Sequence, residues 1–145
     1  MSQNNNKALV ERFWQEVYVD RDYDAVAKYF AEDGVYEDVP SPGSAAIGPD
    51  AVAKRLRIGH EPVESFKHEV HRMVAEGDTV ITEHTETWCF HTGEVVPLPF
   101  VTIQTIADNK ITLWRDYWDL STLMNGVPQW WVEHIMTFSA EDFNA

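Results

Sequence analysis

The sequence has few of the features that identify several large classes of protein. Its one cysteine, Cys89, excludes an internal disulfide, and neither a CxxC nor an HExxH motif is present. No stretch is long and apolar enough to predict a membrane span. Residues 1–7 are polar with no apolar run behind them, so no signal peptide is predicted. We therefore expect a cytoplasmic protein.

Basic residues are also scarce. Eleven Lys and Arg stand against 24 Asp and Glu, and the formal net charge is −13. A nucleic-acid surface needs a basic patch, so this class of partner is not expected. A Gly-rich phosphate loop and a GxSxG motif are absent as well. The length of 145 residues predicts one domain. Within it we expect a polar tail at 1–5 and a loose C-terminus at about 137–145.

The number of aromatic residues is unusual. The chain has 6 Trp, 5 Tyr and 7 Phe, which is more than a small core needs for its volume. Aromatic side chains in such numbers can line a ligand pocket or cover a subunit interface.

Hydrophobic periodicity predicts helices in the first half of the chain and strands in the second. Helices are expected at 7–19, 22–30, 49–58 and 129–136, and strands at 35–39, 66–75, 79–91, 95–107 and 110–120. Gly34 is expected to end the second helix in the left-handed conformation. Pro97 and Pro99 predict an edge or a bulge at the start of their strand. Helices followed by an antiparallel meander indicate an α+β fold.

The strand at 110–120 carries a carboxylate on its aromatic face. Thr112, Trp114, Asp116, Trp118 and Leu120 alternate on that face. A carboxylate among apolar neighbours destabilises the fold unless it has hydrogen-bond or ion-pair partners or stays protonated. Asp116 is therefore a candidate catalytic acid or base. The alternative is a structural Asp that binds backbone or an Arg.

The strand at 79–91 repeats this anomaly, because His84 and Glu86 share its otherwise apolar face with Trp88. If both faces line one cavity, His84 could hold the two acids as a hydrogen-bonded relay. Alternatively, Glu86 and Asp116 could share a proton, one as acid and the other as base. A metal site made of these three residues is a less favoured alternative, and no metal is expected.

The short strand at 35–39 adds two polar groups. Tyr36 and Asp38 are two residues apart, so their side chains share one face. They can supply a hydroxyl and a further carboxylate to the same cavity. For Asp38 the alternative is a solvated acid on an exposed edge. Cys89 falls on the face opposite His84, which argues against a nucleophilic triad.

The sequence resembles the limonene-1,2-epoxide hydrolase family. That family belongs to the nuclear-transport-factor-2-like superfamily, with the ketosteroid isomerases and polyketide cyclases. The likeness covers residues 7–123, and the stretches that carry it are 29–33, 35–40, 82–86 and, most specifically, 110–119. It implies a cone-shaped α+β domain with helices packed on a strongly curved antiparallel or mixed sheet around an apolar pocket. Homodimers are common in the superfamily, so a homodimer is expected.

The resemblance also implies roles for individual residues. The family uses an Asp–Arg–Asp relay with a Tyr and an Asn, and it needs neither metal nor covalent intermediate. Asp116 matches the water-activating Asp and Tyr36 matches the Tyr. Glu86 stands where the family has its acidic Asp, His84 where it has Arg, and Asp38 where it has Asn. Arg holds two carboxylates with a rigid fork, whereas His does so only when protonated.

These observations lead to three hypotheses. The first is cofactor-independent hydrolysis of a small hydrophobic or aromatic epoxide. In it Asp116, with Tyr36 and Asp38, deprotonates water, Glu86 protonates the ring oxygen, and His84 ties the acids together. The residues expected to shape the substrate pocket are Trp88, Trp114, Trp118 and Phe100. The second is a cofactor-free isomerase or lyase that performs proton transfer, dehydration or deformylation of an aromatic substrate. The third is a non-catalytic binding or interaction domain.

Overall fold

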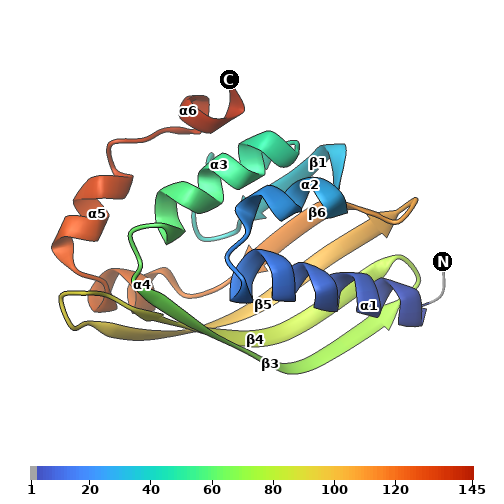
Figure 1. The fold of residues 1–145 in the computed structure, drawn as a ribbon, viewed down its shortest axis with the longest axis horizontal. Helices are drawn as coiled ribbons and strands as arrows, with labels where there is room; N and C mark the ends of the chain where they lie inside the picture. Colours follow the sequence, from blue (N-terminus) through green and yellow to red (C-terminus); the bar gives the residue numbers. More distant parts are fainter. Residues whose placement is uncertain (1–2) are drawn as a thin grey trace.

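The computed structural model describes residues 3–145 and consists of a curved sheet covered by helices. Its strands are β1 (Phe30–Asp38), β2 (Ala46–Ile47), β3 (Ser65–Glu76), β4 (Thr79–Cys89), β5 (Val95–Ala107) and β6 (Lys110–Tyr117). Its α-helices are α1 (Gln3–Phe13), α2 (Val26–Tyr29), α3 (Pro49–His60), α4 (Leu120–Gly126), α5 (Gln129–Ile135) and α6 (Ala140–Asn144). In Figure 1 the sheet bends around α1 and α3, and α4 and α5 lie near the β4–β5 turn.

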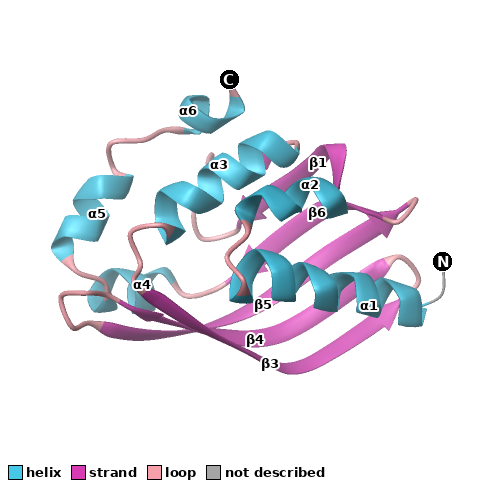
Figure 2. Cartoon of the chain, viewed as in Figure 1, coloured by secondary structure: helices cyan, strands magenta, loops and turns pink. Residues whose placement is uncertain are grey.

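The six-stranded sheet of the described chain has the order β2-β1-β6-β5-β4-β3. Strands β3 to β6 form the predicted antiparallel meander, and β1 joins β6 in parallel, which makes the sheet mixed. Asp108 and Asn109 both have positive φ in the β5–β6 turn, as a tight hairpin requires. Figure 2 separates the helical layer from the strands. The α+β prediction is confirmed.

The first predicted helix exists, with a change of geometry near its end. Helix α1 continues into a π-helical segment, Trp14–Val19. Its buried side chains pack on the sheet: Leu9, Val10, Phe13, Trp14 and Val17. Residues 3–5, which we predicted as tail, belong to α1, and residues 1 and 2 lie outside the described part of the chain.

The second predicted helix is much shorter than expected. Only a 3-10 turn, Tyr23–Ala25, and α2 are helical, and β1 already begins at Phe30. The prediction that Gly34 caps a helix is wrong, because Gly34 lies inside β1 and is not among the glycines with positive φ. A Cβ at Gly34 would lie 2.8 Å from the Ile111 carbonyl oxygen. This glycine therefore permits the close approach of β1 to β6.

The C-terminal residues that we predicted to be loose contain α6. Ser139 and Asp142 form a reciprocal capping box at its start, and Phe143 is buried. Asn144 accepts a hydrogen bond from the Ile47 amide and so ties the helix to β2. The segment is too short to show a clear hydrophobic periodicity. The buried Phe143 and the capped first turn nevertheless stabilise it as a helix.

The prolines of β5 have the predicted effect. Residues Val95 to Phe100 pair with β4 alone, and pairing with β6 begins at Val101. The start of β5 is therefore an edge of the sheet. Pro97 and Pro99 have no amide hydrogen, and at an edge this leaves no neighbouring strand without a hydrogen-bond donor.

Two buried clusters divide the interior. The packed core lies under α1 and includes Phe13, Trp14, Ile106, Ile111 and Trp114. The cavity cluster lies near the β4–β5 turn and includes Trp88, Leu98, Phe100, Leu123 and Trp131. No helix of the described residues is long and apolar enough to cross a membrane.

Candidate active site

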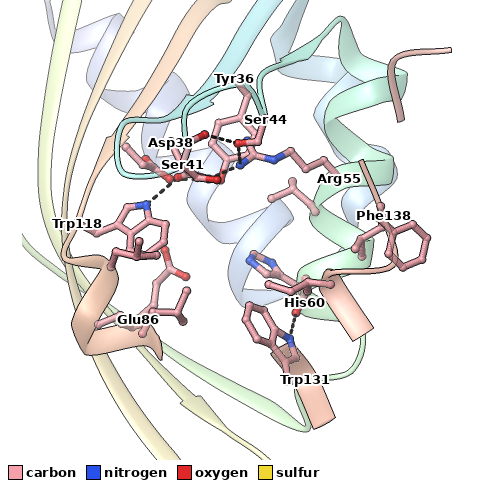
Figure 3. A pocket seen from close by; sticks show the side chains of 18 of the residues that line it. Tyr36, Asp38, Ser41, Ser44, Arg55, His60, Glu86, Trp118, Trp131 and Phe138 are labelled. Atoms are coloured by element: carbon pink, nitrogen blue, oxygen red, sulfur yellow. Dashed lines mark hydrogen bonds and ion pairs between the residues drawn. The ribbon is translucent and has the colours of Figure 1, made fainter. Parts of the chain in front are cut away.

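A cavity of about 340 Å³ opens between the concave face of the sheet and the helices α3 to α6. Its wall is apolar over most of its area, and the side chains that make it so include Leu56, Trp88, Leu98, Phe100, Trp118 and Trp131. Four polar residues predicted for the site, Tyr36, Asp38, Glu86 and Asp116, also line it. In Figure 3 Tyr36 and Asp38 lie together at the top of the view, and Glu86 lies below Trp118. The cavity thus joins polar residues from β1, β4 and β6.

Asp116 sits near the end of β6 and is only 1% exposed. Its Oδ1 accepts hydrogen bonds from Thr102 Oγ1 at 2.6 Å and from Trp114 Nε1 at 2.8 Å. Tyr36 Oη lies 3.4 Å from its Oδ2. Burial, followed by the charge of Asp38, raises the pKa of Asp116 to about 8. This carboxyl therefore exchanges its proton near neutral pH, where acid–base catalysts work best.

Glu86 is the second buried carboxyl of the cavity. It is 1% exposed and its Oε1 accepts a hydrogen bond from Trp88 Nε1 at 3.0 Å. Among the described residues its buried Oε2 has no hydrogen-bond partner. Burial, followed by the charge of Asp116, raises the pKa of Glu86 well above its usual range. A neutral Glu86 has an O–H that it can donate to a ligand.

Asp38 lies in the cavity wall, so the alternative of a solvated acid on an exposed edge does not hold. It forms an ion pair with Arg55 of α3, and its Oδ1 accepts a hydrogen bond from Trp118 Nε1 at 2.8 Å. Tyr36 Oη lies 3.4 Å from its other oxygen. Tyr36 is thus within reach of both Asp38 and Asp116. A ligand that approaches Asp116 meets this hydroxyl as well.

Arg55 is a site residue that the sequence analysis missed. Its Nη2 also donates to Ser44 Oγ at 3.1 Å, and its guanidinium lies 4.4 Å from the centre of the Tyr36 ring (Figure 3). Among the described residues its buried Nη1 has no partner. The available signal was helical spacing, because Arg55 follows the buried Ala51 and Val52 by four and three residues.

His84 does not stand between the two carboxyls. Its Nε2 lies 2.7 Å from Thr102 Oγ1 and its Nδ1 lies 3.0 Å from His68 Nε2. It therefore reaches Asp116 only through Thr102, and the predicted direct bridge to Glu86 is not formed. Burial, then the nearby His68 and His71, lower the pKa of His84 to about 3. A neutral imidazole has no charge with which to bridge two acids.

Three of the four predicted pocket aromatics line the cavity: Trp88, Trp118 and Phe100. Trp114 is not part of that lining in the described chain, and the prediction for it is wrong. It is fully buried and stacks on Tyr36, with ring centres 3.8 Å apart. From behind the wall it donates to Asp116, so it supports the carboxyl and does not contact the cavity.

Thr102 was also missed. It lies on the inward set of β5 with Leu98, Phe100 and Ile106, and it is fully buried. Antiparallel register places it opposite Asp116. Thr102 and Gln104 are the two polar residues of a mostly apolar inward set, a signal of the same kind as the one that identified Asp116 and Glu86.

The metal alternative has no support in the arrangement of donors. Within residues 3–145 no group of three or more His, Cys, Asp and Glu side chains is arranged to hold a metal ion. His84 points to Thr102 and His68, away from the cavity that Glu86 and Asp116 share.

Known proteins support this architecture. The model of the SnoaL-like domain family matches residues 10–114. The epoxide hydrolase EphG of Mycobacterium tuberculosis is 33% identical over 108 residues, which are 73% of this chain and 68% of EphG.

Solved structures agree with these matches. An LEH-like epoxide hydrolase of M. tuberculosis has a TM-score of 0.72 and 27% identity, covering 94% of this chain and 98% of that one. A protein described as a SnoaL-like polyketide cyclase, from Jannaschia sp. CCS1, has a TM-score of 0.77 and 21% identity, covering 86% and 92%. The second likeness shows the fold alone.

Proposed function

The chain belongs to the SnoaL-like domain family, and on this basis we propose that it hydrolyses a small hydrophobic epoxide by cofactor-independent acid–base catalysis. The observation that carries the proposal is a pair of buried carboxyls, Asp116 and Glu86, on the wall of one apolar cavity. Both have raised pKa values, yet their surroundings differ. Two acids whose environments separate their proton affinities can divide the roles of base and acid.

Asp116 is the proposed base. Its ionised form takes a proton from a water molecule, and the oxygen of that water attacks one ring carbon of the epoxide. Tyr36 and Asp38 lie beside Asp116 and hold the water in line with the ring. A pKa of about 8 combines high basicity with a usable ionised fraction near neutral pH.

Glu86 is the proposed acid. As the carbon–oxygen bond breaks, its O–H donates the proton to the departing ring oxygen. The products are a diol, a neutral Asp116 and an ionised Glu86. Asp116 must then lose its proton and Glu86 must regain one before the next turnover.

The cavity indicates the class of substrate. Its volume of about 340 Å³ is at the lower end of the range for small-molecule sites. Met124, Met136 and Phe138 also line it and are themselves partly exposed, so the approach to the carboxyls is apolar. We propose a terpene or aryl epoxide, whose hydrocarbon part would contact Trp88, Phe100 and Trp118.

A panel of terpene and aryl epoxides, followed by mass spectrometry, tests the proposal. The expected product is the diol, and Glu86→Gln abolishes its formation. Glu83→Gln is the matched control, since Glu83 lies on the same strand but is exposed and pairs with Arg72. Diol formation at the wild-type rate in Glu86→Gln would overturn the assignment of the acid.

A second candidate function is a cofactor-free isomerase or lyase. The observation that favours it is Arg55, whose unpartnered Nη1 lies in a side chain stacked over Tyr36. Donors of this kind stabilise an enolate oxygen while a carboxyl moves a proton. Product mass separates the functions, because hydrolysis adds water, isomerisation adds nothing and elimination lowers the mass. Ligand binding without any product would instead favour a binding domain.

The homodimer implied by the resemblance stays a prediction. Light scattering of the purified protein measures its mass in solution and decides between monomer and dimer.

A further inference from the structure

A chain of hydrogen bonds crosses four adjacent strands and ends at Asp116. His68 of β3 lies 3.0 Å from His84 of β4, measured between Nε2 and Nδ1. His84 Nε2 lies 2.7 Å from Thr102 Oγ1 of β5, and Thr102 Oγ1 lies 2.6 Å from Asp116 Oδ1 of β6. Of these four residues, only Asp116 is among the described residues that line the cavity. His68, His84 and Thr102 are not part of that lining.

The two ends of this chain have different surroundings. Asp116 faces the cavity, whereas His68 is partly exposed and lies on β3, the strand at the edge of the sheet. The rings of Trp14 and Tyr18 cover the histidines, with Trp14 centred 4.7 Å from His84. The chain therefore connects a buried carboxyl to a partly exposed histidine, and aromatic rings pack against the two histidines between them.

In each hydrogen bond of this chain, the hydrogen can belong to either of the two atoms. A hydroxyl both donates and accepts, and a neutral imidazole has one donor and one acceptor nitrogen. With Asp116 ionised, the donors run from His68 Nε2–H to His84, from His84 Nε2–H to Thr102, and from Thr102 to Asp116. With Asp116 protonated on Oδ1, all donors point the opposite way. Both arrangements keep every bond.

The histidines stay neutral in both arrangements. Burial lowers the pKa of His68 to about 4 and that of His84 to about 3. A proton can thus move along the chain by exchange of tautomers, without formation of a buried imidazolium.

We propose that Thr102, His84 and His68 form a proton relay that carries the proton of Asp116 to solvent. The Asp116 O–H bond breaks as Thr102 accepts that proton. Thr102 passes its own proton to His84 Nε2, His84 passes one from Nδ1 to His68 Nε2, and His68 releases one from Nδ1 to water. No electrons are transferred. The three residues act through Asp116 as positioning residues.

The catalytic meaning of the relay rests on the proposed function, in which Asp116 gains a proton in every turnover. The groups that face its two ends come from five elements and are Tyr36 and Asp38 of β1, Arg55 of α3, Glu86 of β4, Tyr18 of the π-helical segment and His71 of β3. Only Asp116 among the relay residues has a pKa near neutrality, about 8. Its ionisation is therefore the event that reverses the chain.

NMR of isotope-labelled histidine nitrogens tests the relay without any substrate. As pH rises through about 8, His84 and His68 should both change from the Nδ1–H to the Nε2–H tautomer, and neither should gain a second proton. Asp116→Asn should abolish the change. His71, which is exposed and bonded to Thr85, is the internal control and should not follow it. Fixed tautomers in the wild type, or an unaltered change in Asp116→Asn, overturn the relay.

A matched pair of variants gives the kinetic test. Thr102→Val removes the hydroxyl at nearly constant shape and should lower kcat on the order of tenfold or more with KM nearly unchanged. Thr102→Ser restores the hydroxyl and should restore the rate and its solvent deuterium isotope effect. Equal rates in the two variants contradict the relay. If the tautomers change but no diol forms, the proposed hydrolase function is wrong and the relay stands. If diol forms while the tautomers stay fixed, the hydrolase function stands and the relay is wrong.

Discussion

The two ends of the concave face are built from the same strands and differ in what covers them. At the packed core, the inward residues Val80, Ile106 and Ile111 pack in one buried cluster with the large side chains of α1. At the cavity cluster, the same alternation of β4 and β6 turns Glu86 and Asp116 inward under the short helices α4 to α6. Strand period alone decides which residues face inward. The covering helices decide whether an inward face becomes core or site.

The polar residues show the same division. Near the packed core, Gln104 is fully buried and neither of its amide atoms has a partner among the described residues. In the cavity region, Asp116 and Asp38 each have several donors. These partners hold Asp116 and Asp38 each in one orientation. Glu86 Oε2 and Arg55 Nη1, in the same region, have no partner among the described residues.

The largest expected effect is loss of activity at the cavity. Asp116→Asn should lower kcat/KM roughly 10²-fold to 10⁴-fold, since it removes the base while keeping the shape of the side chain. Asp108→Asn is the matched control, because Asp108 is exposed in the β5–β6 turn and Asn tolerates its positive φ. Diol formation measured by mass spectrometry compares the two. Equal loss in both variants would point to damage of the fold.

The next effect is on stability at the packed core. Phe13→Ala should cost about 3–5 kcal/mol of unfolding free energy, because Phe13 is fully buried and contacts Trp14 and Trp114. Phe100→Ala, on the cavity wall, should cost less and raise KM instead. Urea unfolding and steady-state kinetics measure both. If Phe100→Ala proved the more destabilising, the contrast between the two ends would be lost.

The pH dependence of stability provides a third test. The pKa of Asp116 is raised from 3.8 to about 8, so between these values the folded state keeps a proton that the unfolded state loses. This residue therefore lowers stability as pH rises across the interval. Asp116→Asn should gain stability relative to the wild type by a few kcal/mol over the same range, at about 1.4 kcal/mol per pKa unit. Urea unfolding at several pH values measures the gain, and a constant difference contradicts it.

The buried histidines act in the opposite direction. The pKa of His60 is lowered from 6.5 to about 3, chiefly by burial, so its neutral form stabilises the fold above pH 6.5 and the benefit is lost as pH falls. His60→Gln should therefore lose less stability than the wild type on acidification. His91→Gln, at an exposed position, should follow the wild type.

The smallest effect is expected at the exposed part of the cavity lining. Met136 is 75% exposed, and Met136→Ala should change the unfolding free energy by less than about 0.5 kcal/mol. Its effect should appear in KM for the bulkiest epoxides only. A large change in kcat would mean that this residue approaches the carboxyls.

Much of the site could be predicted from the sequence because it depends on strand period. Two-residue alternation identified Asp116 and Glu86 as inward carboxyls, and Tyr36 and Asp38 as a pair on one face. Arg55 could not be found in this way, since its partnership with Asp38 depends on how α3 packs against β1. The position of His84 behind the wall depends likewise on its bond to His68 across the sheet.

The fold shows a similar limit. Alternation along the strands predicted the meander, and Pro49 in the first helical turn predicted α3; both signals are local. Local signals failed at α2 and Gly34, where pairing of β1 with β6 overrides helical propensity. They also missed α6, a short helix held by Phe143 and by the contacts of Asn144 with β2.

The central claim is that water, activated by Asp116 and assisted by Glu86, opens an epoxide in this cavity. A single turnover of an aryl epoxide in heavy-oxygen water tests it most directly. We predict that the heavy oxygen appears in the diol at once and that Asp116→Asn forms no measurable diol within the time of that turnover. Unlabelled diol from the first turnover, with the label later found in an enzyme carboxylate, would contradict the account because it would mean that a carboxylate had attacked the ring itself.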